Sequence, residues 1–283
     1  MAGRLVTIGS KGGPALRIGG ALPTSSLIDL EGAAAVVDCG LGVTRGLVQA
    51  GVDLRHLPPV FITHLHGDHV LELGPLLYTA WATGLRRPVT VFGPAGLADY
   101  WSGFLASIAF DTALRTLDEG RKPLSEMVEL RVIEPGTVMD DGRLCVSALR
   151  VEHPPVADCF ALRFEGGGRR VTFSADTAPF EQLAGFAWGS DVLVHEAMLP
   201  EAVDRGIAAA GLGQALRDHL HASHTPAAEA ARLAGRAAVR RLVLHHLIPG
   251  DDASVSEADW LEAVTGVWDG DVTIARDGLE ITF

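Results

Sequence analysis

The chain has 283 residues, 48% of them hydrophobic, and carries 23 basic against 35 acidic side chains, which gives a formal charge of −12. This composition is typical of a globular protein with one large core, and no linker or charge block divides it, so we interpret residues 1–283 as a single domain. The acidic balance and the scattered arginines provide no basic stripe for a polyanion, which argues against long nucleic acid as a partner.

In the first half of the chain, short apolar runs alternate with helical patterns. The predicted strands cover residues 4–8, 26–30, 33–38, 60–63 and 89–92. The predicted helices cover residues 44–51, 70–83 and 95–117. Thr44 is the expected N-cap of the first helix, and Gly51 is its expected terminator.

The second half is richer in predicted hairpins. Strands are expected to pair at 137–139 with 144–151, at 159–164 with 170–173, and about Asp277-Gly278, with single strands at 191–194 and 242–244. Helices are predicted at 226–240, with Thr225 as N-cap, and at 256–267. Strands followed by helices, once in each half, indicate two packed sheets with helices outside.

The amino terminus and the cysteines bear on location. The first ten residues lack the apolar core of a signal peptide, and no run of about 18 apolar residues could cross a bilayer. Cys39, Cys145 and Cys159 cannot all pair, and each lies in an apolar run, where a free thiol behaves as a small hydrophobic group. We therefore expect a cytoplasmic protein with reduced cysteines and no membrane partner.

The strongest chemical signal is a loop at residues 64–69 that holds three histidines and an aspartate at the end of a predicted strand. Imidazole nitrogens and a carboxylate suit a borderline cation such as Zn²⁺. One loop cannot easily turn all four groups onto one ion, and alternation places His64 and His66 on one side. Asp68 and His69 can then reach a second metal, if other strand ends complete each ligand set.

Candidates for the missing ligands stand where other predicted strands end. His153, Asp176 and His246 each follow an apolar run, and His224 lies at the mouth of a predicted helix. Taken alone, each of these residues could equally be a hydrogen-bonded core or capping residue. Only the occurrence of these residues together favours their interpretation as metal ligands.

Together these segments resemble the metallo-β-lactamase superfamily and, within it, the ribonuclease Z-like and arylsulfatase-like branch. The resemblance rests on Thr63–His69, His153, Phe173–Thr177, Leu193–Ala197, Ser223–Thr225 and Leu242–His246, and it extends back to Asp38-Cys39-Gly40. The branch usually has glycine where Ala175 stands. The resemblance implies an α/β fold, namely a four-layer αββα sandwich of two packed mixed β-sheets flanked by helices.

The resemblance also implies two divalent metal ions, with zinc expected first and manganese or iron also suited to such ligands. One ion would be bound by His64, His66 and His153. The other would be bound by Asp68, His69 and His246, with Asp176 bridging both. His246 is preferred to its neighbour His245 because the branch places its ligand two residues after the last leucine of the strand.

For the reaction, the resemblance implies a metal-bridging hydroxide, because coordination lowers the pKa of water from about 15.7 to about 7. Asp68, His224 and Glu196 are the residues that we expect to act in catalysis. His224 would hydrogen-bond the developing oxyanion or protonate the leaving oxygen, and Glu196 would orient its ring. His56, His195, His219, His221 and His245 have no matched role and are interpreted as structural or surface residues.

Two segments are candidates for the walls of a substrate pocket, residues 95–127 and 198–222, because they begin and end beside predicted ligands. The first carries four aromatic residues at helical spacing, a pattern more typical of a core than of a pocket: Tyr100, Trp101, Phe104 and Phe110.

The expected function is therefore hydrolysis of a small anionic ester, either a phosphodiester or a sulfate ester. A lactone, lactam or carboxylic ester is the alternative. Processing of transfer RNA is disfavoured, because the ribonucleases carry a basic arm, in many members between the equivalents of His153 and Asp176, where this chain has only 22 residues. A non-catalytic metal-binding protein is disfavoured because all seven ligand positions are filled.

Dimers are common in this branch, and a homodimer is the assembly that the resemblance allows.

Overall fold

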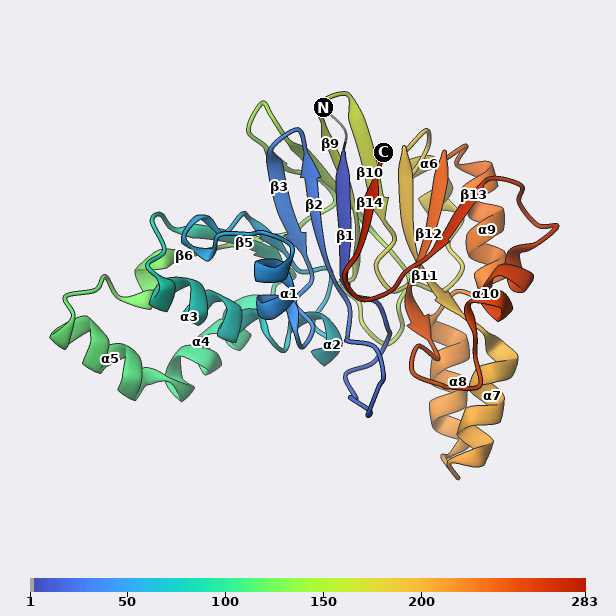
Figure 1. Ribbon diagram of the computed structural model, residues 1–283, viewed down its shortest axis with the longest axis horizontal. Helices are drawn as coiled ribbons and strands as arrows, with labels where there is room; N and C mark the ends of the chain where they lie inside the picture. The colour runs from blue at the N-terminus through green and yellow to red at the C-terminus, as the bar shows by residue number, and fades with distance from the viewer. Residues whose placement is uncertain (1–2) are drawn as a thin grey trace.

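The computed structural model describes residues 3–283 and consists of two seven-stranded sheets packed face to face, with helices on both outer faces (Figure 1). The predicted four-layer αββα sandwich is confirmed. That residues 1–283 form one domain stays a prediction. Among the described residues, no helix is long and apolar enough to cross a membrane.

The first sheet has an antiparallel part, β14-β1-β2-β3, and a parallel part, β3-β4-β5-β6. Its strands are β1 (Arg4–Gly9), β2 (Ser25–Leu30), β3 (Ala33–Val37), β4 (Val60–Phe61), β5 (Val89–Gly93), β6 (Val128–Val132) and β14 (Leu279–Thr282).

The second sheet repeats this plan. Strands β7 to β10 are antiparallel, and β10 to β13 are parallel. They are β7 (Gly136–Asp140), β8 (Cys145–Arg150), β9 (Phe160–Gly166), β10 (Arg169–Phe173), β11 (Val192–Met198), β12 (Arg241–Ile248) and β13 (Asp271–Ile274). Each half of the chain thus brings a set of parallel strands to the molecule, and the carboxyl ends of such strands are where sites are commonly built.

The helices connect these strands and cover the outer faces of the sheets. They are α1 (Val43–Gln49), α2 (Gly67–Val70), α3 (Leu73–Thr83), α4 (Leu97–Ser107), α5 (Ala109–Asp118), α6 (Gln182–Phe186), α7 (Pro200–Ala209), α8 (Gln214–Ser223), α9 (Ala227–Arg236) and α10 (Glu257–Val264), with short 3₁₀ turns η1 (Leu54–His56) and η2 (Leu124–Met127). Figure 1 shows two helical pairs, α4–α5 and α7–α8, projecting from opposite ends of the sandwich.

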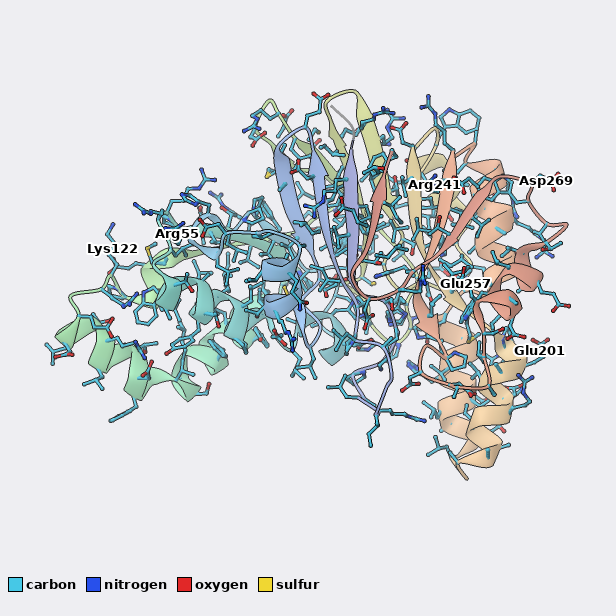
Figure 2. The ribbon with its side chains drawn as sticks, viewed as in Figure 1. Arg55, Lys122, Glu201, Arg241, Glu257 and Asp269 are labelled. Atoms are coloured by element: carbon cyan, nitrogen blue, oxygen red, sulfur yellow. The ribbon has the colours of Figure 1, made fainter. Side chains whose placement is uncertain are left out.

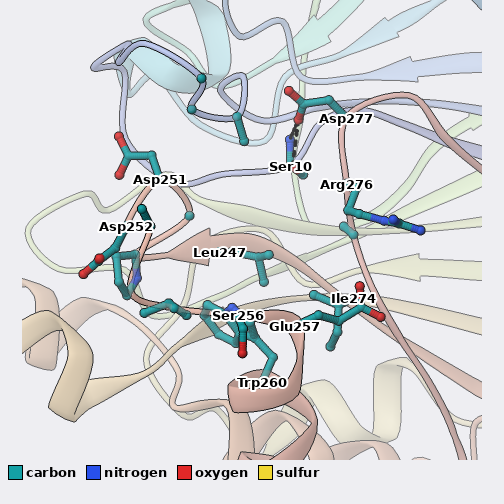
Figure 3. A pocket seen from close by; sticks show the side chains of 18 of the residues that line it. Ser10, Leu247, Asp251, Asp252, Ser256, Glu257, Trp260, Ile274, Arg276 and Asp277 are labelled. Carbon is teal, nitrogen blue, oxygen red and sulfur yellow. Dashed lines mark hydrogen bonds between the residues drawn. The ribbon is translucent and has the colours of Figure 1, made fainter.

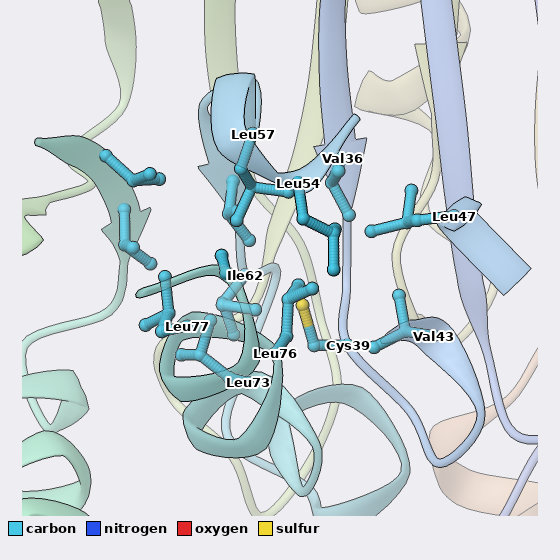
Figure 4. Close-up of a cluster of buried hydrophobic side chains, with 14 of the residues drawn as sticks. Val36, Cys39, Val43, Leu47, Leu54, Leu57, Ile62, Leu73, Leu76 and Leu77 are labelled. Atoms are coloured by element: carbon cyan, nitrogen blue, oxygen red, sulfur yellow. The ribbon is translucent and has the colours of Figure 1, made fainter. Parts of the chain in front are cut away.

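Alternation along the strands divides most apolar side chains among three large cores, and a fourth, smaller cluster lies beneath α7. In β3, Val36 packs outward against α1 and α3, and Val37 points inward between the sheets. Figure 4 shows the outer core of the first sheet, with Val36 near Leu47 and Leu76. In β12, Leu244 joins the outer core of the second sheet beneath α9 and α10. Of the charged side chains labelled in Figure 2, Lys122 and Asp269 lie at opposite edges of the molecule.

Two predicted N-caps are wrong. Thr44 lies inside α1, whose N-cap is Gly42 in a left-handed conformation, and the Glu72 carboxylate accepts hydrogen bonds from the Gly42 and Thr44 amides. Thr225 precedes the N-cap of α9, and its hydroxyl donates to the Thr177 carbonyl instead. The free amides of a helix start can be satisfied by a distant carboxylate, which local sequence does not reveal.

Two other elements also differ from expectation. The helix predicted at 95–117 is broken at Ile108 into α4 and α5. The hairpin expected about Asp277-Gly278 is wrong, because β13 belongs to the second sheet and β14 to the first. The connection crosses between sheets, and the Asp277 carboxylate secures it by accepting hydrogen bonds from Ser10 and the Leu22 amide.

Candidate metal centre

The polar residues at the strand ends converge at one edge of the sandwich. The loop after β4 and helix α2 supply residues 64–69, the loop after β10 supplies Asp176, β11 supplies Glu196, and β12 supplies His246. His153 comes from the turn after β8. All seven residues predicted as metal ligands lie together, in two groups.

The first group consists of His64, His66, His153 and Asp176, and the second of Asp68, His69, Asp176 and His246. Within each group, one ligand atom from every residue lies within 4.8 Å of the others.

Asp176 belongs to both groups. Its Oδ2 lies 3.1 Å from His246 Nε2, 3.3 Å from His69 Nε2, 3.7 Å from His64 Nε2 and 3.8 Å from His153 Nε2. A single carboxylate is thus surrounded by four imidazoles contributed by both halves of the chain. Burial favours the neutral acid, but His246, His69 and His64 outweigh it and hold the pKa of the Asp176 carboxyl well below its usual range.

The orientation of the rings fits bound cations. His69 Nδ1 donates to Asp38 at 2.8 Å and His153 Nδ1 donates to the Ser223 carbonyl at 2.9 Å, so Nε2 carries the lone pair in each neutral ring. His69 Nε2 is buried, faces Asp176 and has no hydrogen-bond partner among the described residues. A lone pair and a carboxylate that face each other in a buried site repel, unless a proton or a metal cation lies between them. The donor set therefore fits divalent metal ions.

Asp38 orients the second group. It is buried at the end of β3 with a positive φ of 60°, and it accepts hydrogen bonds from the Thr63 amide and hydroxyl as well as from His69. A carboxylate behind a metal-binding histidine fixes its tautomer and ring orientation. Sequence analysis gave Asp38 no role, although it ends a predicted strand just as Asp176 follows one.

A β-bulge explains why His246 and not His245 faces the centre. Glu196 pairs with His245 and Ala197 with Leu247, so His246 is the extra residue, and its φ is 47°. Its Nε2 lies 3.2 Å from Asp68 Oδ2. His245 points elsewhere, with Nε2 donating to the Gly9 carbonyl at 2.9 Å.

The amino-terminal loop supports the second group of ligands from outside. The Gly13 amide donates to Asp68 Oδ2 at 2.7 Å. Gly12 packs against His246 so closely that a Cβ there would lie 2.6 Å from the ring atom Cε1. Glycine at residue 12 is required by close approach to a predicted ligand.

His224 and Glu196 form a buried pair beside the metal-binding groups. His224 Nδ1 donates to Glu196 Oε2 at 2.9 Å, and Glu196 Oε1 accepts from the Thr177 amide. Burial opposes the charge on His224, but Glu196 outweighs it and raises the pKa of His224 to about 9. The His224 ring centroid lies 5.1 Å from that of His153 and 5.6 Å from that of His246. The imidazole can thus present its Nε2 to a molecule held at the centre.

Comparisons with known proteins agree with this geometry. A family model described as "Anti-Pycsar protein Apyc1" matches residues 5–225. A ribonuclease Z from Mycobacterium sp. (strain KMS) is 33% identical over 238 residues, which cover 83% of this chain and 81% of that relative. The chain belongs to the Apyc1 family and to the ribonuclease Z-like branch of the metallo-β-lactamase superfamily.

Solved structures share the fold of this metallo-β-lactamase-superfamily protein. The metallo-β-lactamase fold protein YhfI of Bacillus subtilis has a TM-score of 0.71 and 22% identity over 99% of both chains. A diphosphatase of the PhnP family has a TM-score of 0.66 and 14% identity, over 99% of this chain and 98% of its own. The ribonuclease Z relatives and the His/Asp cluster identify the chain as a metal-dependent hydrolase of this superfamily.

The two segments considered as pocket walls differ in their relation to the centre. In residues 95–127, Tyr100 accepts from the Gly74 amide, and Phe104 packs against Gly74, so both residues brace α3. In residues 198–222, the end of α8 lies directly beside the centre, because Ser223 bonds to His153. The carboxyl end of α8 therefore contacts a proposed ligand directly, whereas Tyr100 and Phe104 face α3.

A separate cavity of about 460 Å³ lies between the amino-terminal loop and the segment after β12 (Figure 3). Asp251, Glu257 and Trp260 line it, and none of the seven predicted ligands does. The hydrogen bonds from Ser10 to Asp277, drawn in Figure 3, belong to the crossing between the sheets. This cavity is distinct from the metal centre.

Proposed function

We propose that this metallo-β-lactamase-superfamily hydrolase cleaves a small anionic ester, a phosphodiester or a sulfate ester, with two zinc ions held by the seven predicted ligands. The observation that supports two ions is the position of Asp176 Oδ2, shared by both groups of ligand atoms. When bound, the metals supply positive charge and a water molecule of lowered pKa. The names of the similar proteins support phosphate esters, since a ribonuclease and a diphosphatase are among them.

The charge of the ligand set favours an anionic substrate. Asp68 and Asp176 supply two negative charges and the histidines supply none when neutral, so two divalent ions leave a positive surplus. The net charge of −12 does not cancel it, because exposed charges are screened over about 8 to 10 Å. The centre therefore attracts a small anion in an acidic protein.

His224 is the proton donor of this proposal. With Nδ1 held by Glu196, the protonated ring offers the proton on Nε2 to the oxygen of the leaving group. As the ester bond breaks, the proton passes from Nε2 to that oxygen, and the neutral ring remains hydrogen-bonded to Glu196. Asp68 contributes as a ligand whose position the Gly13 amide fixes.

A small ester is preferred to transfer RNA because of the chain between His153 and Asp176. In this described part of the chain, β9 and β10 form one hairpin closed by Gly167 and Gly168, with no room for a basic arm. Lactones, lactams and carboxylic esters remain alternatives that the same centre could attack.

The test is a panel of substrates with metal analysis. We expect two zinc ions per chain and turnover of bis(4-nitrophenyl) phosphate or 4-nitrophenyl sulfate, exceeding that of a lactone and a β-lactam. His224→Ala should lower kcat by about 10²- to 10⁴-fold with both metals retained. His221→Ala, which removes a half-buried histidine of α8 that bonds to Asp204, is the matched control. Turnover restricted to lactones or lactams, or loss of metal from His224→Ala, would contradict the proposal.

A further inference from the structure

One histidine outside the predicted site lies beside it. Five histidines had no predicted role: His56, His195, His219, His221 and His245. Four of them bond to groups outside both ligand sets, namely Asp53 for His56, the Glu196 carbonyl for His195, Asp204 for His221 and the Gly9 carbonyl for His245. His219 alone of the five stands beside the proposed proton donor.

His219 lies in the carboxyl-terminal half of α8, beside the centre. Its ring centroid lies 6.4 Å from that of His224, in an edge-on arrangement. His219 and His66 are both only partly buried, whereas His64, His69 and His246 are buried. His219 therefore lies on the side of the centre that is open to solvent.

The hydrogen bonds of Ser223 define the tautomer of His219. The Ser223 hydroxyl lies 2.5 Å from the Pro154 carbonyl, which can only accept, so the single hydroxyl hydrogen is used there. Ser223 Oγ also lies 3.3 Å from His219 Nδ1, and this second bond must take its hydrogen from the ring. The neutral His219 ring is thus protonated on Nδ1, and its Nε2 is an acceptor with no recorded partner among the described residues.

We propose that His219 is a specificity-determining residue, whose Nε2 accepts a hydrogen bond from a hydroxyl group of the substrate near the ester that is cleaved. This inference rests on the proposed function and adds the chemical class of the substrate, a hydroxyl-bearing ester. A site that hydrogen-bonds a substrate hydroxyl discriminates against the analogue that lacks it. The helical pair α7–α8 then forms the wall of the site that recognises the substrate hydroxyl.

The test uses two esters that differ only in one hydroxyl, 3-hydroxypropyl 4-nitrophenyl phosphate and propyl 4-nitrophenyl phosphate. We expect the wild-type protein to favour the hydroxyl-bearing ester by roughly five- to tenfold in kcat/KM. His219→Phe should remove this preference through KM and leave the propyl ester within about twofold of wild type. His219→Gln, which keeps an acceptor, should restore part of it, and His221→Phe is the control on the same helix.

A measurement without turnover checks the geometry. Long-range ¹H–¹⁵N correlation spectra should show the neutral His219 ring protonated on Nδ1. Protonation on Nε2, or an equal loss for both esters in His219→Phe, would overturn the inference. A wild-type protein that binds metal and hydrolyses both esters equally would also overturn it, yet leave the proposed function standing. Failure to hydrolyse either ester would count against the proposed function itself.

Discussion

The two halves of the chain contribute to the metal centre in opposite ways. The first half supplies four of the seven proposed ligands from the single loop and helix start at residues 64–69, and the second half supplies His153, Asp176 and His246 from three separate strand ends. The first set is held together by local chain geometry. The second set exists only when β8, β10 and β12 are in register, so metal binding should report on the folding of the second sheet.

The largest effect is expected where the two contributions meet. Asp176→Asn removes a negative charge that both groups share, so we expect loss of both metals. Activity should fall by more than about a hundredfold, a larger loss than that from altering residues that only orient ligands. Elemental analysis and turnover of bis(4-nitrophenyl) phosphate measure it. Asp204→Asn, which changes a surface ion pair with Arg217, is the control. Retention of both metals by Asp176→Asn would show that Asp176 does not bridge.

The second-largest effect is expected to distinguish the two groups of ligands. Gly12→Ala introduces a Cβ 2.6 Å from His246 Cε1 and so displaces one ligand of the second group. We expect the metal content to fall from two ions to one, with the first group still loaded. Gly103→Ala is the control, because a Cβ there meets no atom within 4 Å. Equal loss from both groups would mean that the groups do not bind independently.

A smaller effect is expected from changing Asp38, which accepts a hydrogen bond from the His69 ring. Asp38→Asn keeps a residue that tolerates the left-handed backbone, but weakens the acceptor for His69 Nδ1. We expect metal affinity to fall by about 10- to 100-fold. Titration with a competing chelator measures it, and an unchanged affinity would indicate that the Asp38 charge does not support His69.

The smallest effect is expected from changing Ser223, because its backbone carbonyl, and not its side chain, orients the His153 ring. Ser223→Ala removes the hydroxyl that bonds to Pro154 but keeps the carbonyl that accepts from His153. We expect both metals to be retained and the free energy of unfolding to fall by about 0.5–1.5 kcal/mol. Chelator titration and denaturant unfolding test this. A loss of metal as large as that of Asp38→Asn would remove the contrast between the two halves.

This contrast also explains how much the sequence could predict. The loop at residues 64–69 is visible as a pattern because its ligands are adjacent, and the sheet architecture follows from alternating apolar runs. The dispersed residues were candidates because each follows a predicted strand, but only the family resemblance assigned them to particular ions. The choice of His246 over His245 depends on a bulge, which no periodicity indicates.

The contributions that sequence analysis missed act across long stretches of chain. Asp38 bonds to His69, Gly13 to Asp68, and Glu72 to the start of α1. None of these contacts has a local signature, since each depends on tertiary packing. His219 was missed for the same reason: its role depends on how Ser223 shares its hydrogen bonds with Pro154.

The pairing of the amino-terminal loop with β12 has a consequence for folding. Gly12 donates to the Leu247 carbonyl, and Leu247 donates to the Ser10 carbonyl, so two segments that are distant in sequence hold each other in place. All residues of the first group precede β12 in the chain, whereas the second group is complete only once His246 in β12 is in place. Under the proposed two-ion centre, we expect the second group to form later in folding than the first.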